Sequence, residues 1–132
     1  ISTDHAPHTY EDKLGEFDYA ANGISGLETA VPLIYNEFVK NDYISWMDLV
    51  ELMAVNPAEV IGIDAEGIKE GTAADLTIFD TERSWKVDPD KFKSKGKNTP
   101  FAGKRLTGKV VLTLVDGKIV YDDTGGKNEI IY

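Results

Sequence analysis

The chain has 132 residues, of which 42% are hydrophobic, 28% charged and 10% aromatic, a composition typical of a globular domain with its own core. Fourteen lysines and arginines against 23 aspartates and glutamates give a net charge of −9, which disfavours nucleic acid and anionic membranes as partners. The absence of cysteine excludes disulfides, thiolate metal sites and cysteine nucleophiles. The longest apolar run, residues 30–35, is far shorter than the roughly 20 residues that cross a bilayer, and the first residues do not resemble a signal peptide. A cytoplasmic protein is therefore expected.

The front of the chain is expected to combine an irregular segment with one helix. Residues 1–3 are predicted to end a β-strand, and residues 4–22 have no clean periodicity and are expected to form a long loop. Ser25 and Glu28 have the spacing of a capping box, in which two side chains satisfy backbone N–H groups at a helix start. An amphipathic helix is predicted from there to about Lys40. Its apolar stripe consists of Leu27, Val31, Ile34 and Phe38.

Two further helices are predicted in the next segment. Ser45 and Asp48 repeat the capping-box spacing and indicate the start of the second helix, which is expected to end before Pro57. Asn56 and Pro57 then have the types typical of the cap and first position of a short third helix. Gly62 is expected to end that helix.

The remainder is expected to be rich in β-structure. Residues 74–80 alternate between apolar and polar side chains and predict a strand, and residues 85–87 predict a second, short one. The pair Asp116-Gly117 lies between β-rich runs at 109–115 and 118–121. Both positions of a tight hairpin turn need a positive φ, which Asp and Gly adopt readily, so this pattern predicts a β-hairpin.

The composition divides the chain near residue 63. Residues 1–62 are predicted to be mostly helical and residues 63–132 mostly β, which indicates an α+β chain. The lysine-rich segment 91–103 is expected to be a solvated loop rather than a nucleic-acid patch, because the chain as a whole is acidic. The tail from Asp122 is expected to fray.

The densest chemistry lies at the front, where Asp4 precedes the only two histidines of the chain, His5 and His8. Such a cluster suits metal-assisted hydrolysis. A strand-end aspartate can bind Zn²⁺ through one oxygen and exchange a proton through the other. Spacing alone leaves open a loop cap at Asp4 and a solvated side chain at His8.

Two motifs carry a resemblance to a known family. Residues 2–8 (STDHAPH) and 23–29 (GISGLET) closely resemble the C-terminal part of dihydroorotases of the longer bacterial type, within the amidohydrolase superfamily. Further matching segments are 55–58 (VNPA), 67–76 (GIKEGTAADL), 99–103 (TPFAG) and 108–110 (GKV). The resemblance therefore extends through nearly the whole chain.

The resemblance implies a zinc-dependent enzyme that interconverts N-carbamoyl-L-aspartate and L-dihydroorotate in pyrimidine synthesis. Asp4 would be a metal ligand and the catalytic general acid and base, at the end of the eighth barrel strand. His8 would bind the α-carboxylate of the small-molecule substrate, and the backbone around Asn22 and Gly23 would also contact it. His5 is expected to point away and to make a structural hydrogen bond.

The resemblance also implies a fold larger than this chain. The parent would be an α/β protein, a metal-dependent hydrolase TIM barrel with a composite β-sandwich, and a barrel alone takes about 250 residues. Residues 1–62 would supply the last βα portion with its closing helices, and residues 63–132 part of the sandwich. The family's other metal ligands, a His-x-His pair, a carboxylated lysine and two later histidines, would come from the missing N-terminal part. The chain alone is expected to be inactive and to hold zinc weakly or not at all.

Other functions remain open at this point. A hydantoinase or allantoinase is the alternative within the same enzyme class. An inactive dihydroorotase-like subunit, acting as a scaffold for aspartate transcarbamoylase, is the alternative from another class. An unrelated small binding domain is the third.

Overall fold

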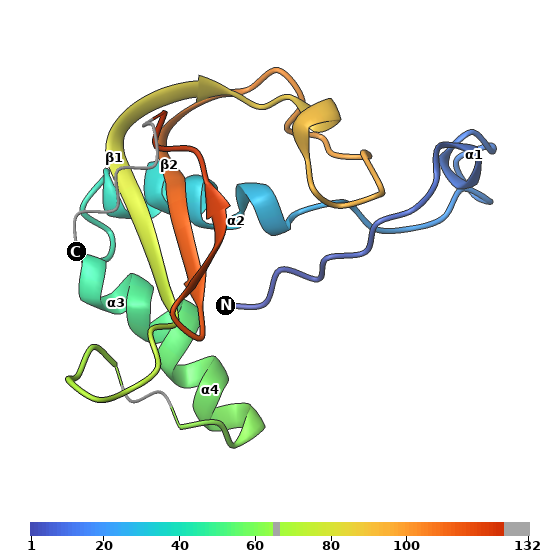
Figure 1. Ribbon diagram of the computed structural model, residues 1–132. Coiled ribbons are helices and arrows are strands. Elements are labelled where there is room, and N and C mark those ends of the chain that lie inside the picture. The colour runs from blue at the N-terminus through green and yellow to red at the C-terminus, as the bar shows by residue number, and fades with distance from the viewer. Residues whose placement is uncertain (65–66, 126–132) are drawn as a thin grey trace.

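A computed structural model describes residues 1–64 and 67–125 of the chain. Two long helical segments pack beside a three-stranded sheet, and a loop carrying a short helix stands away from them (Figure 1). Within the described residues, no helix is long and apolar enough to cross a membrane. The elements are α1 (Tyr10–Lys13), α2 (Leu27–Ile34), η1 (Tyr35–Val39), α3 (Trp46–Val50), η2 (Glu51–Val55), α4 (Asn56–Ile61), β1 (Leu76–Lys86), η3 (Pro89–Lys91), β2 (Arg105–Val115) and β3 (Lys118–Asp122).

The first long helix consists of α2 and the π-helical η1, which follows without a break. The predicted capping box at its start is wrong. Gly26 occupies the N-cap position and supplies no side-chain cap. The Ser25 hydroxyl instead donates to the carbonyl oxygen of Gly96 at 2.6 Å, and the Glu28 carboxylate accepts hydrogen bonds from Ser94. Both predicted capping side chains are therefore used by a segment that lies far away in the sequence.

The second long helix runs through α3, η2 and α4. Its predicted capping box is confirmed, because Asp48 N–H donates to Ser45 Oγ at 3.1 Å and Ser45 N–H donates to Asp48 Oδ2 at 2.7 Å. The prediction of a separate third helix is wrong, since Asn56 continues the second helix and donates its N–H to the Glu51 carbonyl across a π-turn. Pro57, which has no N–H to donate, follows that turn. Gly62, with φ 72°, ends the helix as predicted.

The sheet is antiparallel with the order β1-β2-β3. The predicted hairpin is confirmed: Asp116 and Gly117, with φ 49° and 72°, connect β2 to β3. The two strands predicted at 74–80 and 85–87 are one strand, β1, whose pairing with β2 is irregular between Asp80 and Ser84. Asp80 Oδ1 accepts the N–H groups of the two residues Glu82 and Arg83 there, which explains how the strand continues through the irregularity.

The helices and the sheet share their buried side chains. One cluster contains Tyr35, Val39 and Leu49, with Phe79 of β1 packed against it. The rings of Tyr35 and Trp46 stack with centroids 5.1 Å apart. A second cluster joins Val87, Phe92 and Leu106. Asn36 adds a polar link from the first helix to β2, because its side chain donates to Thr107 O at 2.6 Å and accepts from Thr107 N at 3.1 Å.

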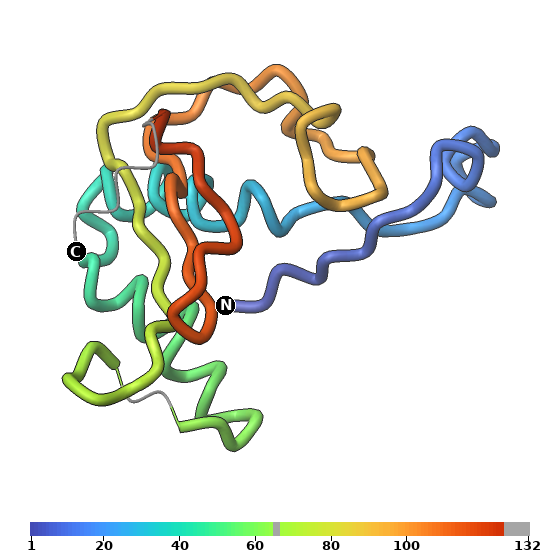
Figure 2. The backbone as a smooth tube through the Cα atoms, viewed as in Figure 1, coloured from blue at the N-terminus to red at the C-terminus, as the bar shows by residue number. Residues whose placement is uncertain are grey.

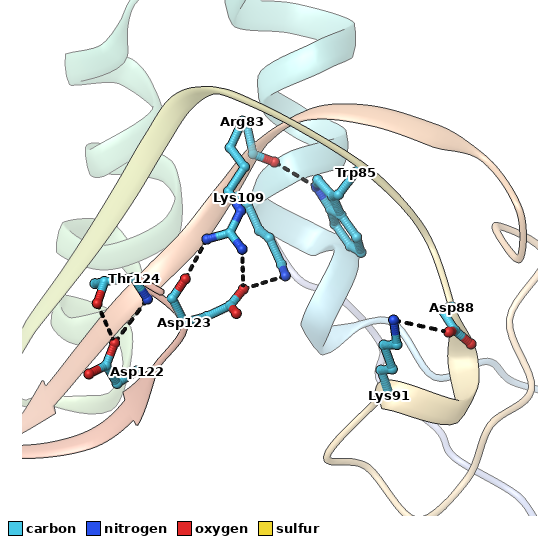
Figure 3. Close-up of polar contacts among 9 residues, drawn as sticks. Arg83, Trp85, Asp88, Lys91, Lys109, Asp122, Asp123 and Thr124 are labelled. Carbon is cyan, nitrogen blue, oxygen red and sulfur yellow. Dashed lines mark hydrogen bonds and ion pairs between the residues drawn. The ribbon is translucent and has the colours of Figure 1, made fainter. Parts of the chain in front are cut away.

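The end of β3 is held across the sheet by Asp123 (Figure 3). Its carboxylate contacts Lys109 Nζ at 2.5 Å and Arg83 Nη2 at 3.1 Å, and its N–H donates to Val111 O at 2.8 Å. The hydrogen bond from Lys109 is the main cause of the lowered pKa of the Asp123 carboxyl. The predicted fraying from Asp122 is thus wrong for Asp122 and Asp123, and the part of that prediction beyond residue 125 lies outside the described residues.

Candidate active site

Two segments that flank the protruding loop come back together at its base (Figure 2). His5 pairs with Ile24 in a parallel β-bridge, and Ala6 N–H donates to Ile24 O at 2.9 Å. Gly23 has φ +111°, and a Cβ placed on it would lie 2.4 Å from Ala6 Cβ. Only glycine accommodates both this backbone conformation and this close approach. Lys13 closes the loop by donating from Nζ to the carbonyl of Gly23 at 3.1 Å.

His5 caps the first long helix. Its Nδ1 accepts the N–H groups of Gly26 at 3.1 Å and of Leu27 at 3.4 Å. The first N–H groups of a helix have no partner within the helix, so an imidazole acceptor in this place satisfies them. The structural hydrogen bond predicted for His5 is therefore present, and it replaces the cap that was expected from Ser25.

Asp4 lies directly before this bridge, with an exposed side chain. Its φ of 46° is in the left-handed region, which residues other than glycine seldom adopt and which is costly unless the surroundings hold it. Within residues 1–64 and 67–125, no hydrogen bond or ion pair reaches its carboxylate. Asp4 thus presents exposed carboxylate oxygens from a constrained backbone.

His8 and Gly23 are held by the same side chain. Asn98 Oδ1 accepts the backbone N–H of His8 at 3.2 Å, and Asn98 Nδ2 donates to the carbonyl of Gly23 at 2.9 Å. The half-buried His8 ring has its Nδ1 3.9 Å from Asp12 Oδ2. Asn22 is exposed beside Gly23. The structure therefore brings the segments of three predicted site residues together through a residue that the sequence analysis did not single out.

Residues 92–98 pack against the segments that carry His8 and Ser25. Gly96 is buried, and a Cβ placed on it would lie 2.6 Å from Pro7 Cβ and 2.9 Å from His8 O. Ser25 N–H donates to Asn98 O at 2.7 Å, and Ser25 is fully buried. The sequence analysis treated these residues as part of a solvated loop. The only signal beside them was the family resemblance of the adjacent segment 99–103.

Glu28 joins residues 92–98 to the first long helix. Its carboxylate accepts hydrogen bonds from the N–H of Ser94 at 2.8 Å and from Ser94 Oγ at 3.1 Å. Partial burial alone would raise the pKa of the Glu28 carboxyl, but the hydrogen bonds from Ser94 outweigh it and lower the pKa below the ordinary 4.5. The stabilisation is then fully present above pH 4.5 and is lost as the pH falls through the lowered folded-state pKa.

We expect the variant Glu28→Gln to lose the part of the stability that depends on the ionised Glu28 carboxylate and that disappears at low pH. The free energy of unfolding, measured by urea titration at several pH values between 7 and about 3, should fall less steeply for the variant than for the unchanged protein. Glu59→Gln, at an exposed position of α4, serves as the control. Equal slopes for the Glu28 variant and the unchanged protein would contradict the role of the Ser94 contacts.

The described residues do not form a complete metal site. No group of three or more histidine, aspartate or glutamate side chains with a suitable arrangement occurs within residues 1–64 and 67–125. The exposed carboxylate of Asp4 fits one ligand position. His5 is less suitable, because its Nδ1 is already used at the helix start. A catalytic metal would need most of its ligands from elsewhere.

Comparisons with known proteins match nearly the whole chain to one family of enzymes. A model of the amidohydrolase family matches residues 1–120. A dihydroorotase of Thermoanaerobacter sp. is 53% identical over 121 residues, which is 92% of this chain and 28% of that protein. A dihydroorotase of Syntrophus aciditrophicus is 49% identical over 123 residues, or 93% of this chain and 29% of that protein. The chain thus spans less than a third of the length of these curated relatives.

Solved structures show the same fold. An L-hydantoinase (dihydropyrimidinase) from Arthrobacter aurescens superposes with a TM-score of 0.75 at 37% identity, covering 82% of this chain and 24% of that one. A D-hydantoinase (dihydropyrimidinase) from Thermus sp. gives a TM-score of 0.80 at 25% identity, covering 91% and 27%. Helices followed by an antiparallel sheet are therefore an arrangement shared with part of larger hydrolases.

Proposed function

Because the chain belongs to the amidohydrolase family, we propose that it is part of a dihydroorotase, an enzyme that interconverts N-carbamoyl-L-aspartate and L-dihydroorotate. The observation that carries the proposal is the exposed carboxylate of Asp4, held at positive φ beside the His8 and Gly23 segments that Asn98 joins. The names of the relatives, which are about half identical over 121 residues, support the substrate.

In the proposed parent, residues 1–62 end a TIM barrel and residues 63–132 belong to a β-sandwich. This division accounts for a functional cluster at the start of the chain, because active sites of such barrels lie at the C-terminal ends of the strands. The remaining metal ligands would come from outside these 132 residues. Zinc is the metal that the resemblance implies, and such a metal, when bound, makes water a better nucleophile near neutral pH.

The chain's own residues would act on the substrate as follows. Asp4 would accept a proton from the attacking water and return it to the ring nitrogen that leaves when the amide bond breaks. His8 would donate a hydrogen bond to the α-carboxylate of the substrate. The backbone around Asn22 and Gly23 would help to fix the orientation of the ring, which raises the rate by holding the reacting atoms in position.

A hydantoinase activity is the second candidate, and the 37% identity to the Arthrobacter aurescens L-hydantoinase favours it. The substrates differ in one recognisable group, since dihydroorotate has a carboxylate that a simple hydantoin lacks. The position of His8 in the site cluster favours the substrate with the carboxylate, because a donor there gains a charge-assisted hydrogen bond.

The test is a substrate comparison on the longest polypeptide encoded by the gene that carries this sequence. We expect hydrolysis of L-dihydroorotate with a kcat/KM at least tenfold above that for hydantoin or dihydrouracil, a ratio that one charge-assisted contact provides. His8→Ala should reduce that preference. The reverse preference would favour the hydantoinase. No cyclic amide hydrolysis, together with co-purification of aspartate transcarbamoylase, would favour the scaffold subunit.

A further inference from the structure

Asn98 lies 90 residues from His8 in the sequence and yet contacts both segments of the candidate site. Its two side-chain groups are used in opposite senses, the carbonyl oxygen as acceptor for His8 N–H and the amide as donor to Gly23 O. A carboxylate could make only the first bond, and an aliphatic side chain neither. The bridge therefore requires a side-chain amide, which asparagine supplies.

The backbone around Asn98 is fixed independently of its side chain. Ser25 N–H donates to Asn98 O at 2.7 Å, and the buried Ser25 hydroxyl donates to Gly96 O at 2.6 Å. Gly96 packs against Pro7 and His8 so closely that a Cβ there would have no room. Because the segment that carries Asn98 is anchored, its side chain can impose a position on the segments that it bridges, rather than follow them.

We propose that Asn98 is a positioning residue that sets the distance between the His8 and Gly23 segments, and with it the shape of the pocket for the substrate. The inference rests on the proposed function, because it assumes that these two segments contact the substrate. Asn98 itself need not touch the substrate. It would act through the backbone N–H of His8 and the carbonyl of Gly23, which are the groups that it holds.

The experiment uses the longest encoded polypeptide with the variants Asn98→Ala and Asn98→Asp. Both should raise KM for the preferred cyclic amide, with a total loss in kcat/KM of about 10- to 100-fold, the size expected when substrate contacts are displaced by up to about 1 Å. Asn41→Ala is the matched control, because Asn41 Nδ2 also donates to two backbone carbonyls, those of Asn36 and Glu37, in a helix end away from the site. Its KM should not change.

A merely structural role makes a different prediction. If the substitutions only impaired folding, a smaller fraction of each variant would be active. The kcat per total protein would then fall while KM stayed constant, and the fall in kcat would parallel the loss of thermal stability. That pattern in both Asn98 variants would overturn the proposal. Raised KM values at a thermal stability similar to that of the Asn41 variant would support it.

Amide hydrogen exchange separates failure of this inference from failure of the proposed function. In Asn98→Ala the His8 amide should exchange at least tenfold faster, because it loses its acceptor, whereas in Asn98→Asp it should remain protected. The helix at 46–61 should be unchanged in both. If the unchanged protein hydrolyses no cyclic amide, this readout still decides: unaltered exchange at His8 in the alanine variant overturns the positioning role, and faster exchange confined to the His8 and Gly23 segments supports it.

Discussion

Asp4→Asn is expected to lower kcat for the ring opening of dihydroorotate by about 10²- to 10⁴-fold, the range that general acid–base groups contribute. Asparagine has nearly the same shape, tolerates the positive φ of 46° at this position, and cannot accept or return the proton. Because the Asp4 side chain is exposed and no hydrogen bond from the described residues reaches it, the thermal stability should change little. The measurement is steady-state kinetics on the longest encoded polypeptide, with a thermal melt of the same samples.

Asp42→Asn is the matched control for this variant. Asp42 is also an exposed aspartate at positive φ, 57°, and it follows the first long helix rather than joining the site cluster. It should keep the activity of the unchanged protein. Activity of the Asp4 variant within about threefold of the Asp42 variant would refute the catalytic assignment of Asp4, since a loss that small is below the contribution of an acid–base group.

Gly108→Ala is expected to destabilise the protein by about 2–5 kcal/mol, the sum of crowding in a packed core and a left-handed backbone. Gly108 has φ +87°, and a Cβ placed on it would lie 2.4 Å from Phe79 Cζ and 2.7 Å from Tyr35 Cδ1. These rings belong to the aromatic cluster between the first long helix and the sheet, so they cannot move aside without losing contacts. The Gly108 carbonyl also accepts the indole N–H of Trp85 at 2.8 Å.

The change can be measured by urea titration followed by tryptophan fluorescence, because Trp46 stacks on Tyr35 in the same cluster. Gly62→Ala isolates the backbone contribution, since Gly62 has φ +72° with nothing within 4 Å of the position a Cβ would take. The free energy of unfolding of the Gly62 variant should fall by only about 1–2 kcal/mol. Equal losses for the two variants would show that the aromatic cluster relaxes around an added methyl group.

Several features could be predicted from the sequence because their causes are local. The Asp116-Gly117 turn, the capping box of Ser45 with Asp48 and the helix end at Gly62 each depend on residues within four positions of one another. Family resemblance likewise singled out the Asp4 to His8 and Gly23 segments, which the structure places side by side. The roles of Asp4, His8, Asn22 and Gly23 in catalysis and binding stay predictions.

The errors of the sequence analysis share a physical cause. A capping-box pattern at Ser25 and Glu28 is locally favourable, but two long-range contacts with residues 94–96 use the same polar groups and bury them. His5 then takes the cap from 21 residues away. The tail prediction failed similarly, because the ion pairs of Asp123 with Arg83 and Lys109 hold the end of β3 against β1 and β2.

The sequence by itself therefore determined the helical front and the β-hairpin, since short-range propensities encode them, and its motifs singled out the segments around Asp4, His8 and Gly23. Only the tertiary structure decided which side chain caps the first helix and which residue joins His8 to Gly23. Asn98 meets those segments across 90 and 75 positions of sequence. Contacts of that separation depend on how the helices and the sheet pack around their shared core, and no local pattern contains that information.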